Sequence, residues 1–230
     1  MVTRLIVVRH AEAEGNLNRL FHGWTDSEIT EKGHRQAELV AKRLKDMKID
    51  VIYSSSLKRA VQTASYIARV KGLPIITSDK LKEINGGEWE NMPWEVLPVK
   101  WPEEYDSWEN KPYAHRMPGG ECMREFQERI VKEFEHIINN NKGKNICVVT
   151  HGTAIRTLMC HFHGCRLEDM NNIPWCDNTA VTIVDYDDEE GKFKVIVEGD
   201  NSHLSKDMKT IENQDWWQEI MNRTDKDRNP

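Results

Sequence analysis

Three strand-like runs in this chain are each followed closely by side chains that bind or attack anions. Arg9 and His10 follow the apolar run LIVV, and His151 and Gly152 follow the run NICVVT. Arg59 stands in the first turn of the helical pattern after IDVIYSS. Because ligands collect at the carboxyl ends of strands in open, mostly parallel sheets, we expect these side chains to meet at one edge.

Two arginines and two histidines at one sheet edge indicate a site for a phosphate group. An arginine at a helix start opposes the helix dipole, so Arg59 needs a negative partner to compensate. Guanidinium groups bind phosphate oxygens in bidentate fashion, and helix N-termini offer free N–H groups. Taken singly, Arg9 could form a strand-end salt bridge, and His10 or His151 could be structural. Their joint placement favours an anion pocket.

Such a pocket suits phosphoryl transfer. A neutral imidazole is a competent nucleophile, and arginines neutralise the charge that develops on the phosphoryl oxygens. The leaving oxygen also needs a proton donor, which a carboxyl group held protonated by its surroundings can supply. The stretch SDKLKEINGGEWENMPWE offers Asp79, Glu83, Glu88 and Glu90, and composition and spacing alone do not choose among them.

The elements that must position these residues alternate between strands and helices in the N-terminal part. The spacing predicts a helix over 30–45 with Thr30 as its N-cap, after the LIVV strand. A strand over 49–55, a helix in LKRAVQTASYIARV and a short strand in LPIITS follow. Strands interleaved with helices favour a mostly parallel sheet that is covered on both faces.

The middle of the chain, residues 89–120, has a different character. It contains four tryptophans and five prolines, which indicates a compact, partly helical insertion. Helical spacing returns from Glu121, with apolar residues at Met123, Phe126, Ile130, Phe134 and Ile137. A strand over 145–150, a helix in GTAIRTLMCHF and a hairpin made of TAVTIVDY and FKVIVEG complete the pattern.

We therefore predict an α/β fold: a three-layer α/β/α sandwich with a mostly parallel central sheet and a small, partly helical lid insertion over about 89–118. Residues 1–204 are expected to form a single catalytic domain. Residues 205–230 are highly charged and are expected to be a C-terminal extension, in which DWWQEIMNR forms a short docked helix and TDKDRNP frays.

Composition excludes several classes of protein. A net charge of −6 argues against a general nucleic-acid-binding protein. The apolar runs are all too short for a membrane-spanning helix, and LIVV is too short for the core of a signal peptide. The five cysteines indicate reduced thiols, so we expect a cytoplasmic protein without nucleic-acid or membrane partners.

These residues resemble the histidine phosphatase superfamily, the phosphoglycerate mutase-like enzymes, over roughly residues 5–204. The stretch RHAEAEGN resembles the family's signature, with Arg9, the nucleophile His10, and Asn16 as a phosphate-contacting residue. FHGWTDSEITEKGHRQA resembles the segment that follows it, in which His22 and Gly23 line the substrate side.

Further motifs follow in the family's order. SSSLKRAVQTA carries the second phosphate-binding arginine, Arg59, and LKEINGGEWEN resembles the acid motif, which selects Glu83 as proton donor. PGGE, VTHGTAIR with His151 and Gly152, DNTAV and DNSHL complete the series. The chain departs from the usual glycines at Ala11 and at Asn91, neither of which is a catalytic position; asparagine can adopt the left-handed conformation.

The resemblance implies a metal-independent, two-step reaction without a cofactor. His10 attacks a phosphomonoester and forms a phosphohistidine while Glu83 protonates the departing alcohol, and Glu83 then activates water to release inorganic phosphate. Arg9, Arg59 and His151 hold the phosphoryl group throughout. The substrate is expected to be a small phosphorylated metabolite, and Asn16, His22, Gly23 and Gly152 are expected to contribute to phosphate or substrate binding.

Within the family we favour the phosphatase branch. Mutases carry a longer insertion after the acid motif with clustered basic residues for a substrate carboxylate, whereas here Lys100, Lys111, His115 and Arg116 are scattered. A phosphoglycerate mutase-type phosphoryl transfer is the first alternative. A non-catalytic phosphate-binding protein is the second, although His10 and Glu83 are both present.

Two stretches contain residue types that bind metal ions, but neither has the spacing of a common metal site. CHFHGC has two cysteines and two histidines, but the spacing is not that of a zinc finger and the side chains diverge on a helix. DYDDEEG is acidic but lacks the ordered ligand spacing of a calcium loop. No metal site is therefore predicted.

Overall fold

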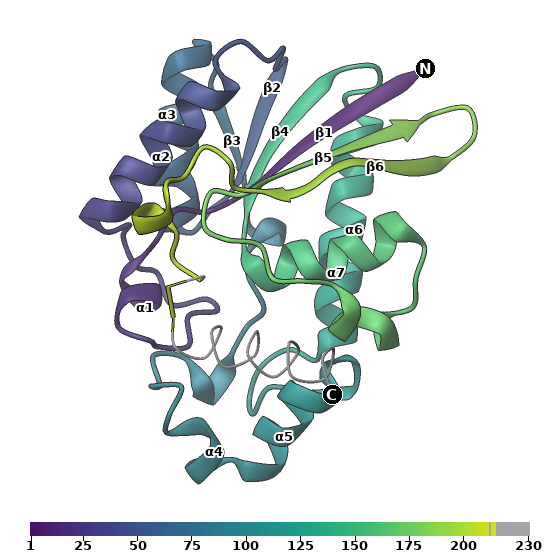
Figure 1. The fold of residues 1–230 in the computed structure, drawn as a ribbon. Coiled ribbons are helices and arrows are strands. Elements are labelled where there is room, and N and C mark those ends of the chain that lie inside the picture. Colours follow the sequence, from purple (N-terminus) through teal and green to yellow (C-terminus); the bar gives the residue numbers. More distant parts are fainter. Residues whose placement is uncertain (212, 215–230) are drawn as a thin grey trace, which may run out of the picture.

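The computed structural model describes residues 1–211, 213 and 214, and it forms a six-stranded sheet between two layers of helices (Figure 1). The strand order is β3-β2-β4-β1-β5-β6. β3, β2, β4 and β1 are parallel, whereas β5 runs antiparallel to β1 and to β6. The strands are β1 (Val2–Arg9), β2 (Val51–Ser55), β3 (Ile75–Ser78), β4 (Asn145–Thr150), β5 (Val181–Asp187) and β6 (Lys192–Asp200).

The helices divide between the two faces of the sheet and the lid. Figure 1 shows α2 and α3 on one face, α6 and α7 on the other, and α4 and α5 beyond the carboxyl ends of the parallel strands. The α-helices are α1 (Glu14–Leu17), α2 (Glu31–Leu44), α3 (Lys58–Lys71), α4 (Leu97–Lys100), α5 (Pro102–Asn110), α6 (Met123–Asn139) and α7 (Gly152–His163). The 3-10 helices are Asp79–Leu81, Gly87–Trp89, Pro112–Ala114, Leu167–Asn172 and Lys206–Met208. The predicted three-layer sandwich with a partly helical lid is confirmed.

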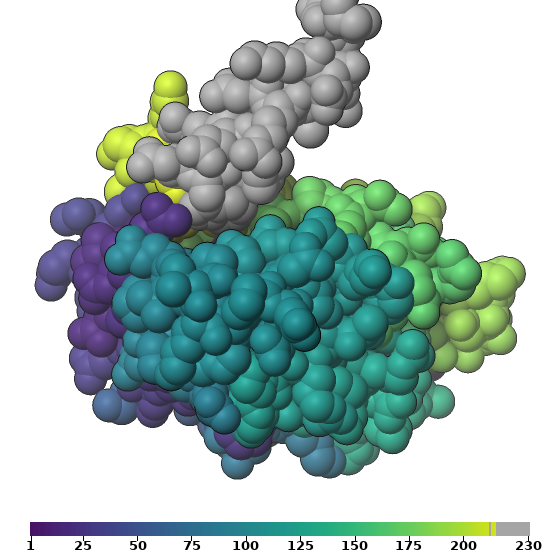
Figure 2. All heavy atoms as spheres, turned by 90° about the horizontal axis from the view of Figure 1, so that it is seen from below, coloured from purple at the N-terminus to yellow at the C-terminus, as the bar shows by residue number. Residues whose placement is uncertain are grey.

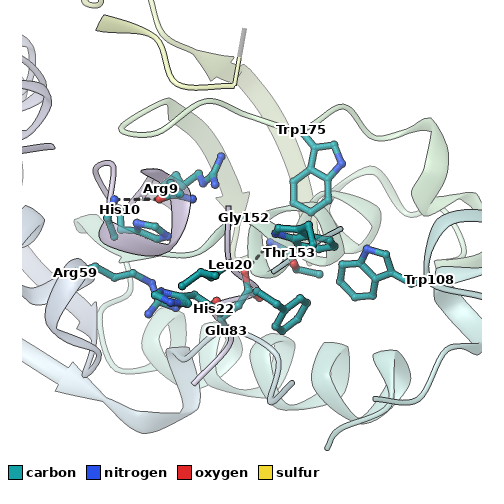
Figure 3. A pocket seen from close by; sticks show the side chains of 14 residues that line it. Arg9, His10, Leu20, His22, Arg59, Glu83, Trp108, Gly152, Thr153 and Trp175 are labelled. Carbon is teal, nitrogen blue, oxygen red and sulfur yellow. Dashed lines mark hydrogen bonds between the residues drawn. The ribbon is translucent and has the colours of Figure 1, made fainter. Parts of the chain in front are cut away.

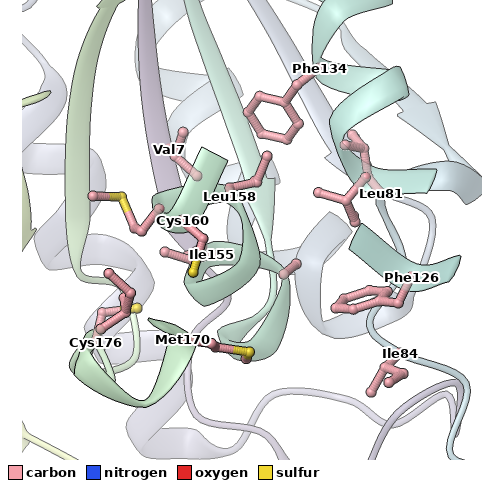
Figure 4. Close-up of a cluster of buried hydrophobic side chains, with 14 of the residues drawn as sticks. Val7, Leu81, Ile84, Phe126, Phe134, Ile155, Leu158, Cys160, Met170 and Cys176 are labelled. Carbon is pink, nitrogen blue, oxygen red and sulfur yellow. The ribbon is translucent and has the colours of Figure 1, made fainter. Parts of the chain in front are cut away.

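The side chains of β1 contribute to the hydrophobic cores on both faces of the sheet, because successive side chains of a strand point to opposite faces. Leu5 and Val7 pack with the buried residues of α6 and α7, and Ile6 and Val8 pack with those of α2 and α3. All four side chains are at most 1% exposed. Figure 4 shows Val7 in the first cluster, near residues of α6 and α7 such as Phe134 and Leu158. A central strand that is buried on both faces fixes the position of the residues that follow it.

The predicted element boundaries shift by a few residues where local chemistry decides them. The strand predicted over 49–55 begins at Val51, and Asp50 before it bonds to Asn145 through both its backbone N–H and its carboxylate. The strand in LPIITS begins at Ile75, directly after Pro74, which has no N–H to donate.

The lid is held together by aromatic side chains. Trp89 is fully buried, and its ring lies 6.3 Å from that of Trp101, 6.1 Å from that of Trp108 and 5.3 Å from that of His115. Seen from below, the teal residues of the middle of the chain form the centre of this face of the molecule (Figure 2). Trp89 and Trp101 therefore pack inside the compact insertion that the sequence indicates.

Part of the predicted C-terminal extension packs against the sheet edge. Thr210 and Ile211 are 5% and 6% exposed, and both backbone N–H groups donate to the Asp177 carboxylate. The Thr210 hydroxyl donates to the buried Glu12 carboxylate, next to the loop after β1. The helix predicted in DWWQEIMNR and the fraying predicted for TDKDRNP lie outside the described residues. No helix in the described part of the chain is both long and apolar enough to cross a membrane.

The predicted N-cap of α2 provides a test of local stability. The Thr30 hydroxyl accepts a hydrogen bond from the Gly33 N–H at 3.0 Å and donates one to Glu12 at 2.8 Å. We expect Thr30→Ala to lower the free energy of unfolding by about 1–2 kcal/mol, because both groups lose a partner. Chemical denaturation measures this change. Glu38→Ala, at an exposed position of the same helix, is the control, and equal stability of the two variants would contradict the capping role.

Candidate active site

His10 and His151 lie side by side because β1 and β4 are neighbouring parallel strands. Arg9 pairs with Thr150 in the register, and the His10 N–H donates to the Thr150 carbonyl at 2.9 Å. The two imidazole rings are 5.1 Å apart between centroids. The expectation that the strand ends would bring these histidines together is therefore met.

The environment of His10 fixes both its charge and its tautomer. Nδ1 lies 2.7 Å from the Ala11 carbonyl oxygen, which can only accept, so Nδ1 carries the proton. Burial, together with the charges of Arg59 and Arg9, holds the pKa of His10 well below its usual range. At neutral pH the ring is uncharged and its Nε2 lone pair is available for attack on phosphorus.

The backbone around His10 is clamped by a segment that the sequence analysis did not assign a role. The Asn178 side-chain amide donates to the His10 carbonyl at 2.8 Å, and the Thr179 N–H donates to the Arg9 carbonyl at 3.1 Å. In return, Arg9 donates to the Cys176 carbonyl at 2.7 Å. These bonds connect the end of β1 to the approach to β5.

Arg59 is buried with its charge retained. It is 1% exposed, and its guanidinium donates to the carbonyls of Gly23 at 2.7 Å and Thr25 at 2.8 Å. Burial lowers the pKa of Arg59 to about 10, which still leaves the group protonated at neutral pH. The Nε atoms of Arg59 and Arg9 are both buried without a hydrogen-bond partner. Two unpaired cationic donors in one pocket suit a bound anion.

The Glu90 carboxylate orders residues 23–25, the loop whose carbonyls bind Arg59. Glu90 accepts hydrogen bonds from the backbone N–H groups of Gly23, Trp24, Thr25 and Gly86. It also accepts one from the Thr25 hydroxyl. Glu90 was one of the four candidate acids in the sequence, and its oxygens are occupied by this loop instead.

Glu83 is the candidate acid that lines the pocket. Its Oε1 accepts from the Ile84 N–H and its Oε2 from the Thr153 N–H, both at 2.9 Å. Burial raises the pKa of Glu83, and the two backbone N–H groups and the nearby arginines oppose this shift. A buried carboxyl group with a raised pKa can both donate and accept a proton.

The other candidate acids lie elsewhere. Asp79 is exposed and bonds to Ser56 and Lys82, and Glu88 is exposed at the start of the lid. With Glu90 occupied by the 23–25 loop, Glu83 is the only one of the four that contacts the pocket.

The remaining predicted site residues divide into pocket-lining and supporting positions. Asn16, His22 and Gly152 line the pocket, whereas Gly23 and His151 do not. Gly23 acts through its backbone, and a Cβ there would lie 2.1 Å from the Ile84 carbonyl oxygen. His151 is fully buried behind His10, with Nε2 2.8 Å from the Ser55 hydroxyl and Nδ1 unpaired.

His22 is oriented from both sides. Its Nδ1 lies 3.0 Å from the Ser27 hydroxyl and its Nε2 3.0 Å from the Asn91 side-chain oxygen. Asn91 has a φ of 63°, so the residue that departs from the family's glycine does adopt the left-handed conformation. Its side chain gives His22 a partner that a glycine does not offer.

An aromatic wall faces the polar end of the pocket. Phe21, Trp94, Trp108 and Trp175 line it together with Leu20. Figure 3 shows Trp108 and Trp175 on the side of the pocket away from Arg59 and His10. The sequence analysis missed Trp175, which stands in the irregular stretch IPWCD where no periodic signal identifies it.

The described residues include no group of three or more His, Cys, Asp or Glu side chains arranged to bind a metal ion. In CHFHGC, Cys160 is buried in the core, His161 packs against Phe193 and His163 pairs with Glu198. These side chains diverge, as their positions on a helix imply.

Comparison with known proteins adds independent evidence. The model of the histidine phosphatase superfamily (branch 1) matches residues 5–199. The chain is 33% identical over 183 residues to phosphoserine phosphatase 1 of Hydrogenobacter thermophilus, covering 80% of this chain and 86% of that protein. It is 32% identical over 174 residues to a 2,3-bisphosphoglycerate-dependent phosphoglycerate mutase of Cytophaga hutchinsonii, covering 74% and 81%.

Solved structures agree on the fold. Bacillus stearothermophilus YhfR superposes with a TM-score of 0.84 at 33% identity, covering 88% of this chain and all of that one (100%). A mycobacterial glucosyl-3-phosphoglycerate phosphatase superposes with a TM-score of 0.79 at 21% identity, covering 86% and 99%, which is a likeness of fold alone.

The Glu90 network predicts a loss of anion affinity on mutation. Glu90→Ala leaves four backbone N–H groups without their acceptor and frees the carbonyls that hold Arg59. We expect affinity for inorganic phosphate to fall by about tenfold or more, because hydrogen bonds to charged groups are among the stronger ones. Calorimetric titration measures it. The exposed neighbour Glu88→Ala is the control, and unchanged binding in Glu90→Ala would refute the role of Glu90.

Proposed function

The chain belongs to the histidine phosphatase superfamily and is therefore a phosphatase or a mutase, and from this premise we propose that it is a phosphomonoester hydrolase with His10 as nucleophile. The observation that carries the proposal is the state of His10. It is a buried, uncharged imidazole whose Nδ1 donates to Ala11, beside two arginines with unpaired donors.

The proposed reaction has two steps. The Nε2 of His10 attacks phosphorus in line, the bond between phosphorus and the ester oxygen breaks, and Glu83 gives its proton to the departing alcohol. Glu83 then takes a proton from water, which attacks the phosphohistidine and releases inorganic phosphate and neutral His10. Arg9 and Arg59 neutralise the phosphoryl oxygens during both steps. The N-terminus of α7, where Gly152 and Thr153 stand, adds its positive end.

His151 supports the nucleophile in this scheme, because it is fully buried and does not line the pocket. Its ring packs against His10, and its Nε2 contact with the Ser55 hydroxyl leaves Nδ1 without a protein partner. A hydrogen bond that the Ser55 hydroxyl donates to Nε2 leaves the ring proton on Nδ1.

The charges in the pocket favour hydrolysis over the isomerisation of phosphoglycerate that a mutase catalyses. Among the described lining residues, Arg9 and Arg59 are the only arginines and there is no lysine. Both are needed for the phosphoryl group, so a substrate carboxylate has no cationic partner in the described lining. Product analysis distinguishes the alternatives, because a mutase isomerises phosphoglycerate without releasing phosphate.

The first test is loss of the nucleophile. The wild-type protein should release phosphate from p-nitrophenyl phosphate in the presence of EDTA, and His10→Ala should reduce this rate at least about 10³-fold. His136→Ala, at an exposed histidine of α6, should keep wild-type activity. Full activity in His10→Ala would exclude the mechanism, and loss of wild-type activity in EDTA would show a metal requirement.

The second test concerns the proton donor. Glu83→Gln should slow alkyl phosphates by about 10²-fold or more but aryl phosphates far less, because a good leaving group needs little protonation. His10 must be uncharged and Glu83 protonated, so kcat/KM for alkyl phosphates should fall as pH rises through the raised pKa of Glu83. This alkaline limb should disappear in Glu83→Gln. Equal losses on both substrate types would remove Glu83 from the acid role.

A further inference from the structure

The wall of the pocket opposite the phosphate end is built almost entirely from aromatic rings. Phe21, Trp94 and Trp108 form one contiguous cluster, with ring centroids 5.3 Å apart for Phe21 and Trp94 and 5.8 Å apart for Phe21 and Trp108. Phe21 and Trp108 are 4% and 8% exposed, so they mainly support the wall, whereas Trp94 and Trp175 are only partly buried. Their packing fixes the shape of this wall before any substrate binds.

Trp175 forms a second part of the wall and is held from behind by a cation. The Arg156 guanidinium lies over the indole at 4.4 Å from the ring centroid. Arg156 is itself fixed, since it donates to the carbonyls of Ile173 at 3.1 Å and Met170 at 2.9 Å. One face of Trp175 is therefore occupied by Arg156, and the side chain borders the pocket.

Gly152 sets the distance between this indole and the phosphate end. A Cβ at Gly152 would lie 3.2 Å from a ring carbon of Trp175 and 3.3 Å from Arg9 Nε. Trp175 and Arg9 thus approach the same glycine at the start of α7. A group that stacks on Trp175 can be joined to a phosphate at Arg9 by only a short link.

Three basic residues of the lid, Lys100, His115 and Arg116, have other partners or are uncharged. Lys100 lies over the Trp101 ring at 4.2 Å, and Arg116 pairs with Glu125 at 2.7 Å. His115 is 1% exposed, and burial lowers its pKa to about 4, so it is uncharged at neutral pH. A carboxylate placed against the aromatic wall would lose its hydration without gaining a cationic partner from the lid.

We propose that Trp175, with the Phe21, Trp94 and Trp108 cluster, selects phosphomonoesters whose alcohol carries an uncharged aromatic or heteroaromatic ring a short link away from the phosphate. This inference rests on the proposed hydrolase function and extends it to a substrate class. Rings stack on preformed aromatic surfaces with little loss of freedom, and such surfaces disfavour small alcohols that carry a carboxylate. Small phosphorylated amino acids and phosphoglycerates are accordingly poor substrates of this pocket.

The test compares esters whose leaving alcohols have similar acidity, so that differences report binding to the wall. We expect kcat/KM for 2-phenylethyl phosphate to exceed that for ethyl phosphate, phosphoserine and 3-phosphoglycerate by about tenfold or more. A preference for phosphoserine or 3-phosphoglycerate would overturn the proposal. Release of phosphate from ethyl phosphate tests the hydrolase function separately, and absence of turnover with every ester would reject that function and the inference together.

Variants identify the residue that creates the preference. Trp175→Leu should lower kcat/KM for 2-phenylethyl phosphate roughly five- to tenfold and that for ethyl phosphate much less. Trp175→Phe, which retains a ring, should keep most of the preference. Trp101→Leu changes a lid tryptophan outside the pocket lining and should not alter it. Equal losses on all esters in Trp175→Leu would assign Trp175 a purely structural role and overturn the proposal.

Discussion

The site depends on the burial of two guanidinium charges beside an imidazole that must stay uncharged. Arg9 and Arg59 are 7% and 1% exposed, and burial together with their charges lowers the pKa of His10. Burying a charge is costly unless it is hydrogen-bonded. The carbonyls of Cys176, Gly23 and Thr25 supply these bonds. The positions of the two guanidinium groups therefore depend on the loops that carry these carbonyls.

Much of the remaining architecture can be understood as support for that arrangement. The register between β1 and β4 brings His10 next to His151, and the N-terminus of α7 reaches Glu83 through the Thr153 N–H. Glu90 orders the loop that binds Arg59. Catalytic and positioning groups thus come from widely separated parts of the sequence, and the parallel strand ends bring them to one edge.

Part of this could be predicted from sequence, because the signals are local. Apolar runs followed by charged residues mark the strand ends, and helical spacing identifies α2, α3, α6 and α7. The choice among Asp79, Glu83, Glu88 and Glu90 could not be made from composition, since four similar carboxyl groups within twelve residues differ only in what surrounds them after folding. Only the resemblance to a known family selected Glu83.

Trp175 was missed for the same reason, and the Asp177–Asn178 segment was recognised only as part of the motif DNTAV, without a role. They lie in an irregular stretch, and their partners Arg156, His10 and Thr210 are distant in sequence. The last of these contacts has a consequence for biosynthesis. The strand that precedes His10 is translated before its two partner strands, residues 145–150 and 181–187. The Asp177 side chain, next to the clamp on His10, bonds to Thr210 and Ile211, which are translated later still. The surroundings of His10 therefore acquire their hydrogen bonds only after residues as far as 211 have been translated.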